Sequence, residues 1–189
     1  IYLDTDERRR FAQVSHEYLI EQVQESTLTT HETASVTNDL NFNHPVKELI
    51  WTVAESKSST KGSQPTKAAG DAKVSDGTYQ LKLNGHDRFS ARDRSYFTRT
   101  QVWQHHSGAG GLDTQAVDGG AGKFNDSIAV YSFALKPEEH QPSGTCNFSR
   151  IDNAQLVSGA GGNNADTIFA VNYNVLRIMS GMGGLAYSN

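Results

Sequence analysis

Cysteine is almost absent from this chain. Among 189 residues there is only one, Cys146, so no disulfide can form within the chain. Paired C-x-x-C motifs are missing too, which removes the usual cysteine-based zinc sites. This cysteine usage is typical of proteins made in a reducing compartment. We expect Cys146 to be a small, buried apolar residue.

Long apolar runs and concentrated positive charge are also missing. No apolar stretch approaches the roughly 18 residues that a membrane-spanning helix needs, and no signal peptide is visible. The formal net charge is −4, and lysine and arginine are scattered. The basic run at 8–10 follows Asp4, Asp6 and Glu7, so we interpret it as a solvated or ion-paired helix face. The sequence therefore predicts no direct contact with nucleic acid.

Motifs that carry catalysis, metals or cofactors are not formed. None of the seven histidines lies in H-E-x-x-H or H-x-H, and the adjacent His105 and His106 would diverge on a helix. No G-x-S-x-G nucleophile elbow occurs. Gly181–Ala186 fits a dinucleotide fingerprint, but no room remains for the helix that must follow, so we predict a turn there. Gly119–Lys123 lacks the phosphate-loop spacing. We predict no catalytic residue, no metal site and no cofactor.

Glycine, by contrast, is abundant, and its 17 residues are clustered between alternating apolar segments. Alternation with a period of two places apolar side chains on one face of a strand, where a second sheet would bury them. The strongest strand candidates are 46–53, 79–83, 128–135 and 168–179, with a weaker one at 18–23. In three of these strands one apolar face is expected to be covered by the other sheet: Leu49, Trp51 and Val53; Tyr79, Leu81 and Leu83; and Phe169, Val171, Tyr173 and Val175. The Gly-rich and Ser-rich stretches 55–77, 107–127 and 158–167 are predicted loops. This pattern indicates an all-β domain with two facing sheets.

Two short helices are predicted beside the strands. The first follows Asp4, with Glu7 at the capping-box spacing. The second follows Ser90 and continues to Trp103. Three aromatic side chains share one face of this second helix, so we expect them to pack on a sheet: Tyr96, Phe97 and Trp103.

The segment 133–153 joins two apolar alternating stretches through a polar corner. Pro137 and Pro142 fix the backbone φ angle, and Gly144 permits a positive one, so the chain can reverse sharply. We expect these three residues to have a structural role and not a chemical one. Two N-x-S sequons are present, and without a secretory signal we expect them to be unused; Asn125, in a predicted loop, is the better glycosylation candidate.

The order and content of several blocks resemble one viral family. The blocks are Tyr2–Phe11, His16–Gln22, Asn43–Trp51, Leu83–Phe89, Phe133–Asn153, Phe169–Ile178 and Gly181–Ser188. Together they resemble the C-terminal half of the major capsid protein of the nucleocytoplasmic large DNA viruses. The resemblance implies that residues 1–189 form the second roll of a double jelly roll. That roll would be an eight-stranded antiparallel jelly-roll sandwich with short helices and long loops.

The same resemblance implies a purely structural function, with no catalytic residues. Three copies of the full protein would form a homotrimeric, pseudo-hexagonal capsomer, and neighbouring capsomers would tile an icosahedral shell. Further implied partners are minor capsid proteins and, indirectly, an internal viral membrane. The protein would be made and assembled in the host cytoplasm and would reside in the virion. We expect the loops to lie at capsomer contacts or on the outer tower. Because the chain opens at Ile1 as if within a strand and lacks the first roll, we expect it to be part of a longer polypeptide.

Two other functions fit an all-β sandwich. A carbohydrate-binding module would use Trp51 and Trp103 to stack on sugars, although both lie in apolar patterns that favour the core. A glycan array without hits and quenching-resistant tryptophan fluorescence would exclude it. A hydrolase on the same sandwich would lose activity on mutation of His140, and we expect no activity to lose.

Overall fold

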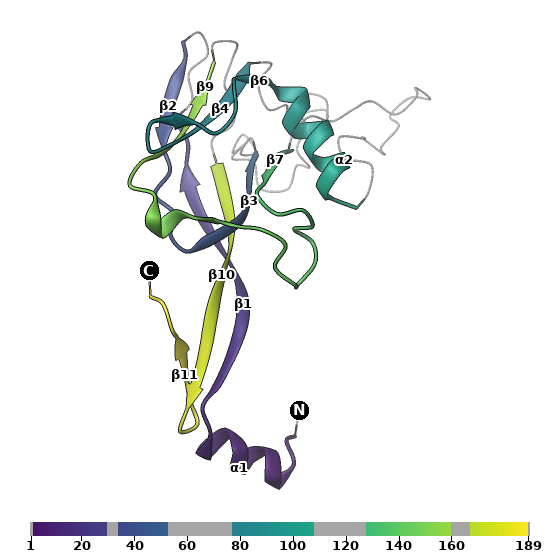
Figure 1. The fold of residues 1–189 in the computed structure, drawn as a ribbon, viewed down its shortest axis with the longest axis vertical. Coiled ribbons are helices and arrows are strands. Elements are labelled where there is room, and N and C mark those ends of the chain that lie inside the picture. The colour runs from purple at the N-terminus through teal and green to yellow at the C-terminus, as the bar shows by residue number, and fades with distance from the viewer. Residues whose placement is uncertain (1, 30–33, 53–76, 108–127, 160–166, 189) are drawn as a thin grey trace, which may run out of the picture.

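The computed structural model describes residues 2–29, 34–52, 77–107, 128–159 and 167–188, and these form a two-sheet body with a long projecting arm (Figure 1). The elements are α1 (Thr5–Gln13), β1 (His16–Thr27), β2 (Val36–Asp39), β3 (Pro45–Thr52), β4 (Thr78–Leu83), β5 (His86–Asp87), β6 (Arg92–Asp93), η1 (Tyr96–Thr100), α2 (Gln101–His105), β7 (Ile128–Ser132), β8 (Cys146–Asn147), η2 (Phe148–Arg150), β9 (Ala154–Ser158), β10 (Thr167–Met179) and β11 (Met182–Leu185). The predicted loops lie almost wholly outside the described residues, and Asn125 lies outside them.

Both sheets are antiparallel, and each is built around a path of four paired strands. The first has the strand order β1-β10-β3-β7, and the second has the order β2-β9-β4-β5. These two paths contain eight strands, and the short strands β6, β8 and β11 pair at their margins. The fold prediction of an eight-stranded antiparallel sandwich with short helices is therefore confirmed. In the part of the chain that the structure describes, no helix is long and apolar enough to cross a membrane.

The core lies between the two sheets and is centred on Trp51. Its indole packs against the rings of Tyr79, at 5.4 Å, and Phe97, at 5.1 Å between centroids. All three side chains are at most 1% exposed. The predicted inward faces of β3 and β4 are thus confirmed by Leu49 and Leu81, which are equally buried. Burying each such side chain stabilises the fold by about 1.5–3 kcal/mol.

For β10, the predicted inner face was wrong for Phe169 and Val171, although Tyr173 of the same set is buried. Phe169 and Val171 alternate as expected, but they lie on the outer side of the sheet. The inward positions are Ile168 and Ala170, each fully buried, and Ile168 pairs directly with Trp51 of β3. Both faces of this central strand are apolar, so alternation alone does not identify the inner one.

The second predicted helix exists but has a different register. It begins with a π-helical segment, η1, and continues as α2. Because a π turn contains an extra residue, the positions after it rotate away from the face predicted for a regular helix. Phe97 is buried as expected, whereas Trp103 is 79% exposed. The inward position belongs to Gln101, whose Oε1 accepts a hydrogen bond from the Ser132 backbone N–H at 3.1 Å.

The first helix and the polar corner lie close to their predicted positions. Helix α1 begins after Asp4, whose carboxylate accepts a hydrogen bond from the backbone N–H of Thr5 at 2.7 Å. The corner occupies 133–145, between β7 and β8, with Pro137 almost fully buried and Pro142 exposed. Gly144 has φ +147°, and a Cβ at this position would lie 2.7 Å from the Phe133 carbonyl oxygen. Cys146 is only half-buried, and this burial raises the pKa of its thiol.

Candidate assembly surface

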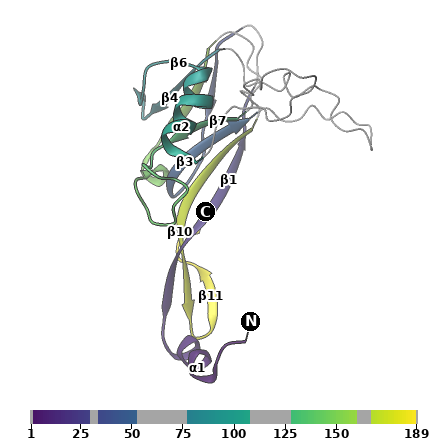
Figure 2. The same cartoon turned by 90° about the vertical axis from the view of Figure 1, so that its right-hand side faces the viewer.

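One part of the molecule extends beyond the two-sheet body. We define the arm as residues 2–21 together with residues 174–187: α1, the first half of β1, the last part of β10, and β11. Strand β3 accompanies β10 only as far as Asn172, and beyond that point β10 is flanked by β1 and β11. The arm is thus a single layer with α1 at its tip, as both ribbon views show (Figures 1 and 2). No second sheet covers either of its faces among the described residues.

Both faces of the arm carry apolar side chains. Directly paired residues of an antiparallel sheet project to the same side, so the strand register assigns each residue to a face. One face carries Tyr18, Ile20, Leu176, Ile178 and Leu185, and the other carries Leu19, Val175, Met179 and Met182. Leu19 is 53% exposed and Met182 is 74% exposed. The arm therefore presents two apolar surfaces to its surroundings.

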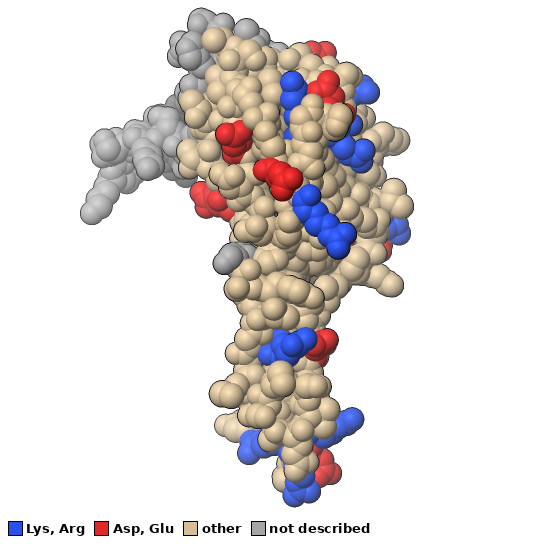
Figure 3. Space-filling view, turned by 60° about the vertical axis from the view of Figure 1, so that its left-hand side comes forward, with Lys and Arg blue, Asp and Glu red and all other residues tan. Residues whose placement is uncertain are grey.

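Exposed apolar residues are concentrated on the arm. Thirteen large hydrophobic side chains are exposed among the described residues, and nine belong to the arm: Tyr2, Leu3, Val14, Tyr18, Leu19, Met179, Met182, Leu185 and Tyr187. In the space-filling view the charged side chains on the arm form a band and a group at the tip (Figure 3). A concentration of exposed apolar side chains on one part of a molecule indicates an interaction surface.

A few polar contacts order the arm. Arg177 of β10 bonds Glu17 of β1 through Nε, at 2.8 Å, and Nη2, at 2.6 Å. The amide of Asn174 donates to Gln22 Oε1 and to the Tyr187 carbonyl oxygen, both at 2.9 Å, and so fixes the segment after β11. Because Arg177 and Glu17 are exposed, their ion pair adds at most about 1 kcal/mol. These contacts fix the shape of the arm, and they leave its two apolar faces uncovered by the described residues.

The sequence did not predict β11. Gly183 and Gly184 interrupt the apolar alternation that would have identified this strand. The signal available in the sequence was the Ser180-Gly181 pair. In the structure this pair links β10 to β11, and its φ angles are 51° and 77°. Two successive positive φ angles are the mark of a tight two-residue hairpin turn. The predicted turn is therefore confirmed at Gly181, whereas Gly183 and Gly184 belong to the returning strand β11, which the sequence analysis did not predict.

The residues proposed for other functions do not converge on a site. Trp51 is buried, so it cannot stack on a sugar, and the exposed Trp103 lies on a different element. A polar groove of about 540 Å³, lined by residues 39–43, 148–149 and 151–155, contains neither tryptophan. The fully exposed His140 is 3.8 Å from Glu21. Within the described residues, no group of three or more His, Cys, Asp or Glu side chains could hold a metal ion.

Comparison with known proteins identifies the family. Residues 7–184 match the family described as the large eukaryotic DNA virus major capsid protein. The chain is 54% identical to the major capsid protein of Pyramimonas orientalis virus over 203 aligned positions, which cover 100% of this chain and 47% of that protein. It is 40% identical to the major capsid protein of Paramecium bursaria Chlorella virus 1, with coverage of 100% and 52%. The chain thus spans about half the length of the curated relatives it matches.

The fold agrees with these relatives. A solved VP54 chain of PBCV-1, fitted into a reconstruction of the virophage Sputnik, superposes with a TM-score of 0.73 at 37% sequence identity. That superposition covers 100% of this chain and 55% of the VP54 chain. The capsid resemblance drawn from the sequence is therefore confirmed. The chain belongs to the major capsid protein family of large eukaryotic DNA viruses, a family of structural proteins and not of enzymes.

Proposed function

We propose that residues 1–189 are the C-terminal jelly roll of a major capsid protein whose other half is a second roll. Three copies of the complete protein would form a pseudo-hexagonal capsomer, and these capsomers would tile the outer shell of an icosahedral virion. Support comes from the family match, from coverage of 47% and 52% of the two relatives described above, and from a TM-score of 0.71 to a chain of the PBCV-1 capsid. Synthesis and assembly in the host cytoplasm belong to the same proposal.

The observation that carries this proposal is the apolar arm. Met182 is 74% exposed in the isolated chain. Covering such an apolar side chain with a neighbouring surface lowers the free energy of the assembly. Full burial of a large apolar side chain is worth about 1.5–3 kcal/mol, so these partly exposed groups would each contribute a fraction of that. Closed symmetric assembly repeats every such contact many times. We propose that other rolls of the capsomer cover the apolar faces of the arm, and that minor capsid proteins are further partners. The internal membrane would be reached only indirectly, and nucleic acid would not be contacted.

Electron microscopy of the full-length protein tests the capsomer directly. Three-fold particles with a six-sided outline are the expected result. To test the arm, we would replace Leu19 and Met182 with threonine, which keeps strand propensity while removing apolar surface. Leu135→Thr is the matched control, because Leu135 is 73% exposed but belongs to the corner and not to the arm.

The expected result is a loss of trimers for the arm variant and normal trimers for the control. Circular dichroism of each variant would establish that the fold is retained, since exposed substitutions typically change stability by only about 0.5 kcal/mol. An arm variant that assembles like the unmodified protein would refute the assignment of the arm. A full-length protein that stays monomeric would refute the capsomer itself.

A further inference from the structure

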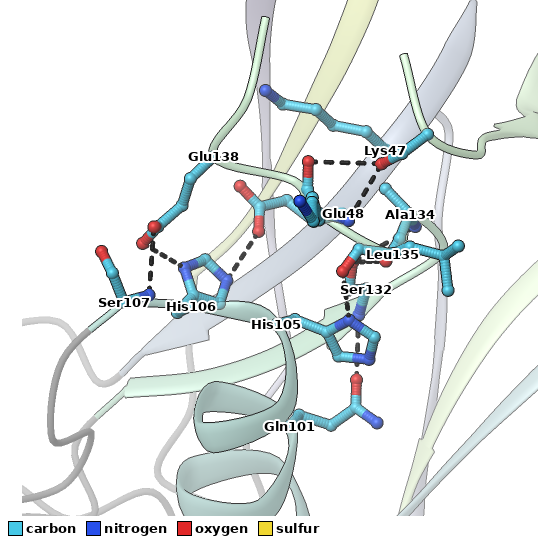
Figure 4. Close-up of polar contacts among 12 residues, drawn as sticks. Lys47, Glu48, Gln101, His105, His106, Ser107, Ser132, Ala134, Leu135 and Glu138 are labelled. Carbon is cyan, nitrogen blue, oxygen red and sulfur yellow. Dashed lines mark hydrogen bonds and ion pairs between the residues drawn. The ribbon is translucent and has the colours of Figure 1, made fainter. Parts of the chain in front are cut away.

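His106 is held between two carboxylates that come from distant parts of the chain. It follows α2, and its ring lies between Glu48 of β3 and Glu138 of the corner (Figure 4). Nε2 is 3.0 Å from Glu48 Oε2, and Nδ1 is 3.2 Å from Glu138 Oε1. The other Glu138 oxygen accepts the backbone N–H of Ser107 at 3.0 Å. One imidazole ring thus connects a core strand, a helix end and the corner.

The protonation state of this ring determines whether both contacts are favourable. A neutral imidazole has one N–H, whereas an imidazolium donates from both nitrogens. Ionised carboxylates can only accept hydrogen bonds. A neutral ring has a single N–H to donate, so one of the two carboxylates must then face the lone pair of the other ring nitrogen. The Glu48 side chain is only 8% exposed. Its Oε2 and the Nε2 of His106 are buried, neither atom has a hydrogen-bond partner among the described residues, and the two atoms face each other as an ion pair at 3.0 Å. An unpaired buried carboxylate is costly.

The other charged groups near the ring are already engaged. Lys47, next to Glu48 on β3, forms its ion pair with Glu21 of β1 at 2.8 Å. On the corner, Lys136 pairs with Glu139 at 3.1 Å, and His140 lies beside Glu21. Two further titratable groups lie nearby. The adjacent residue His105 contacts the Leu135 carbonyl oxygen through Nδ1. The other is Tyr173, and burial raises the pKa of its hydroxyl above the ordinary value of 10. None of the described groups replaces the His106 proton between the two carboxylates.

We propose that His106 is a proton-operated latch: its imidazolium form fastens the corner, residues 133–145, and the end of α2 to β3, and loss of its proton loosens the corner. The corner is tied to β3 at its base by backbone hydrogen bonds from Phe133 and Ala134 to the Lys47 carbonyl oxygen, at 2.9 and 3.2 Å. Further along the corner, Glu138 is the contact to His106. The latch is a property of this chain alone and does not depend on the proposed capsomer.

The direction of the pH response follows from the pKa. Hydrogen bonding to Glu48 is the largest influence and raises the pKa of His106 above its ordinary 6.5; burial opposes this shift, and Glu138 adds to it. A group whose pKa is raised by folding stabilises the fold fully below its unfolded pKa and loses that contribution as the pH rises through the folded value. The latch is therefore closed at acidic pH and opens as the pH rises above 6.5.

The test is a pH titration of the 189-residue chain by NMR. Ring nitrogen shifts report the His106 protonation midpoint, and amide protection factors of Phe133 and Ala134 report how firmly the corner is held. We expect a midpoint above 6.5 and protection that falls as the pH rises through that midpoint. Glu138→Gln should lower the midpoint. Glu139→Gln is the matched control, because Glu139 lies on the same corner but pairs with Lys136, and it should leave the midpoint unchanged.

His106→Gln should remove the pH dependence of corner protection. If this variant does not fold, Glu138→Gln decides the question, because Glu138 lies at the surface and its substitution leaves the core intact. An unchanged midpoint in Glu138→Gln overturns the proposal. So does a folded His106→Gln protein whose corner loses protection with rising pH as steeply as the unmodified chain.

Discussion

Replacing Gly144 with alanine is expected to destabilise the fold for two separable reasons. The first is backbone conformation, because φ +147° is a value that residues with a Cβ rarely adopt. Holding a residue in such a region costs about 1–3 kcal/mol. The second is space, because the new Cβ would lie 2.7 Å from the Phe133 carbonyl oxygen and 3.2 Å from Ala134 Cα. Both are backbone atoms, so no side-chain rotation relieves the contact.

The cost of the steric contact with the new Cβ is estimated from the backbone atoms that must move to relieve it. Phe133 and Ala134 donate backbone hydrogen bonds to the Lys47 carbonyl oxygen, so displacing them weakens at least one of these bonds. A backbone hydrogen bond contributes about 0.5–1.5 kcal/mol net. Adding this to the conformational cost gives about 1.5–4.5 kcal/mol for Gly144→Ala. In a chain of this size, about 1 kcal/mol shifts Tm by roughly 2–4 °C.

Gly85→Ala is the matched control. Gly85 also has a positive φ, +78°, but a Cβ there would meet nothing within 4 Å. Only the conformational cost remains, about 1–2 kcal/mol for a left-handed residue with a Cβ. Urea unfolding followed by circular dichroism measures both variants against the unmodified chain. Equal losses for the two variants, or a Gly144→Ala loss below about 1 kcal/mol, would show that the corner is not as closely packed as the argument requires.

The remaining predictions concern the core and one turn. Trp51→Ala should cost about 3–5 kcal/mol by urea unfolding, whereas Trp51→Phe should cost less, about 1.5 kcal/mol, because it also removes a buried indole N–H that has no hydrogen-bond partner among the described residues. Trp103→Ala should change stability by no more than about 0.5 kcal/mol, and iodide should quench Trp103 alone; equal quenching of both tryptophans would contradict the assigned core. Asn84→Ala should cost about 2–3 kcal/mol, because Asn84 has φ 51° and its Oδ1 accepts two backbone N–H groups at 2.9 and 3.1 Å. Asn84→Gly keeps the turn conformation and should lose less, so the reverse order would refute that reading.

The sequence was most informative where a strand has one apolar face. On β4, Tyr79 and Leu81 alternate with more polar and less buried neighbours, so burial follows the alternation. On β3, Leu49 and Trp51 are buried as expected, although Lys47 and Glu48 are buried as well. On β10 the same reasoning failed, since Val171 faces outward and Ala170 inward. A strand that is apolar on both sides is oriented by its partners, and pairing partners are not encoded locally.

Other features depend on contacts that no short motif reveals. The π turn that exposes Trp103 has no recognisable residue pattern, and Gln101 is drawn inward by the backbone of β7, far away in the sequence. His106 was judged only as a metal ligand, because Glu48 and Glu138 reach it solely through the tertiary fold. The arm was missed as a surface because apolar strands are ordinarily read as core. The resemblance in the sequence blocks, in contrast, correctly identified the family.

Strand β10 has a mechanical consequence, because it runs unbroken from the body into the arm. Ala170 is fully buried in the body, while Met179, near the far end of the same strand, is half exposed. Force applied at the tip is therefore transmitted along one covalent lever to the centre of the molecule. The pairing of β10 with β3 shifts between Val171 and Asn172, and such a bulge locally interrupts the ladder. The β1–β10 ladder keeps one register across the same region, so we expect the arm to bend where β10 separates from β3 while it stays paired with β1.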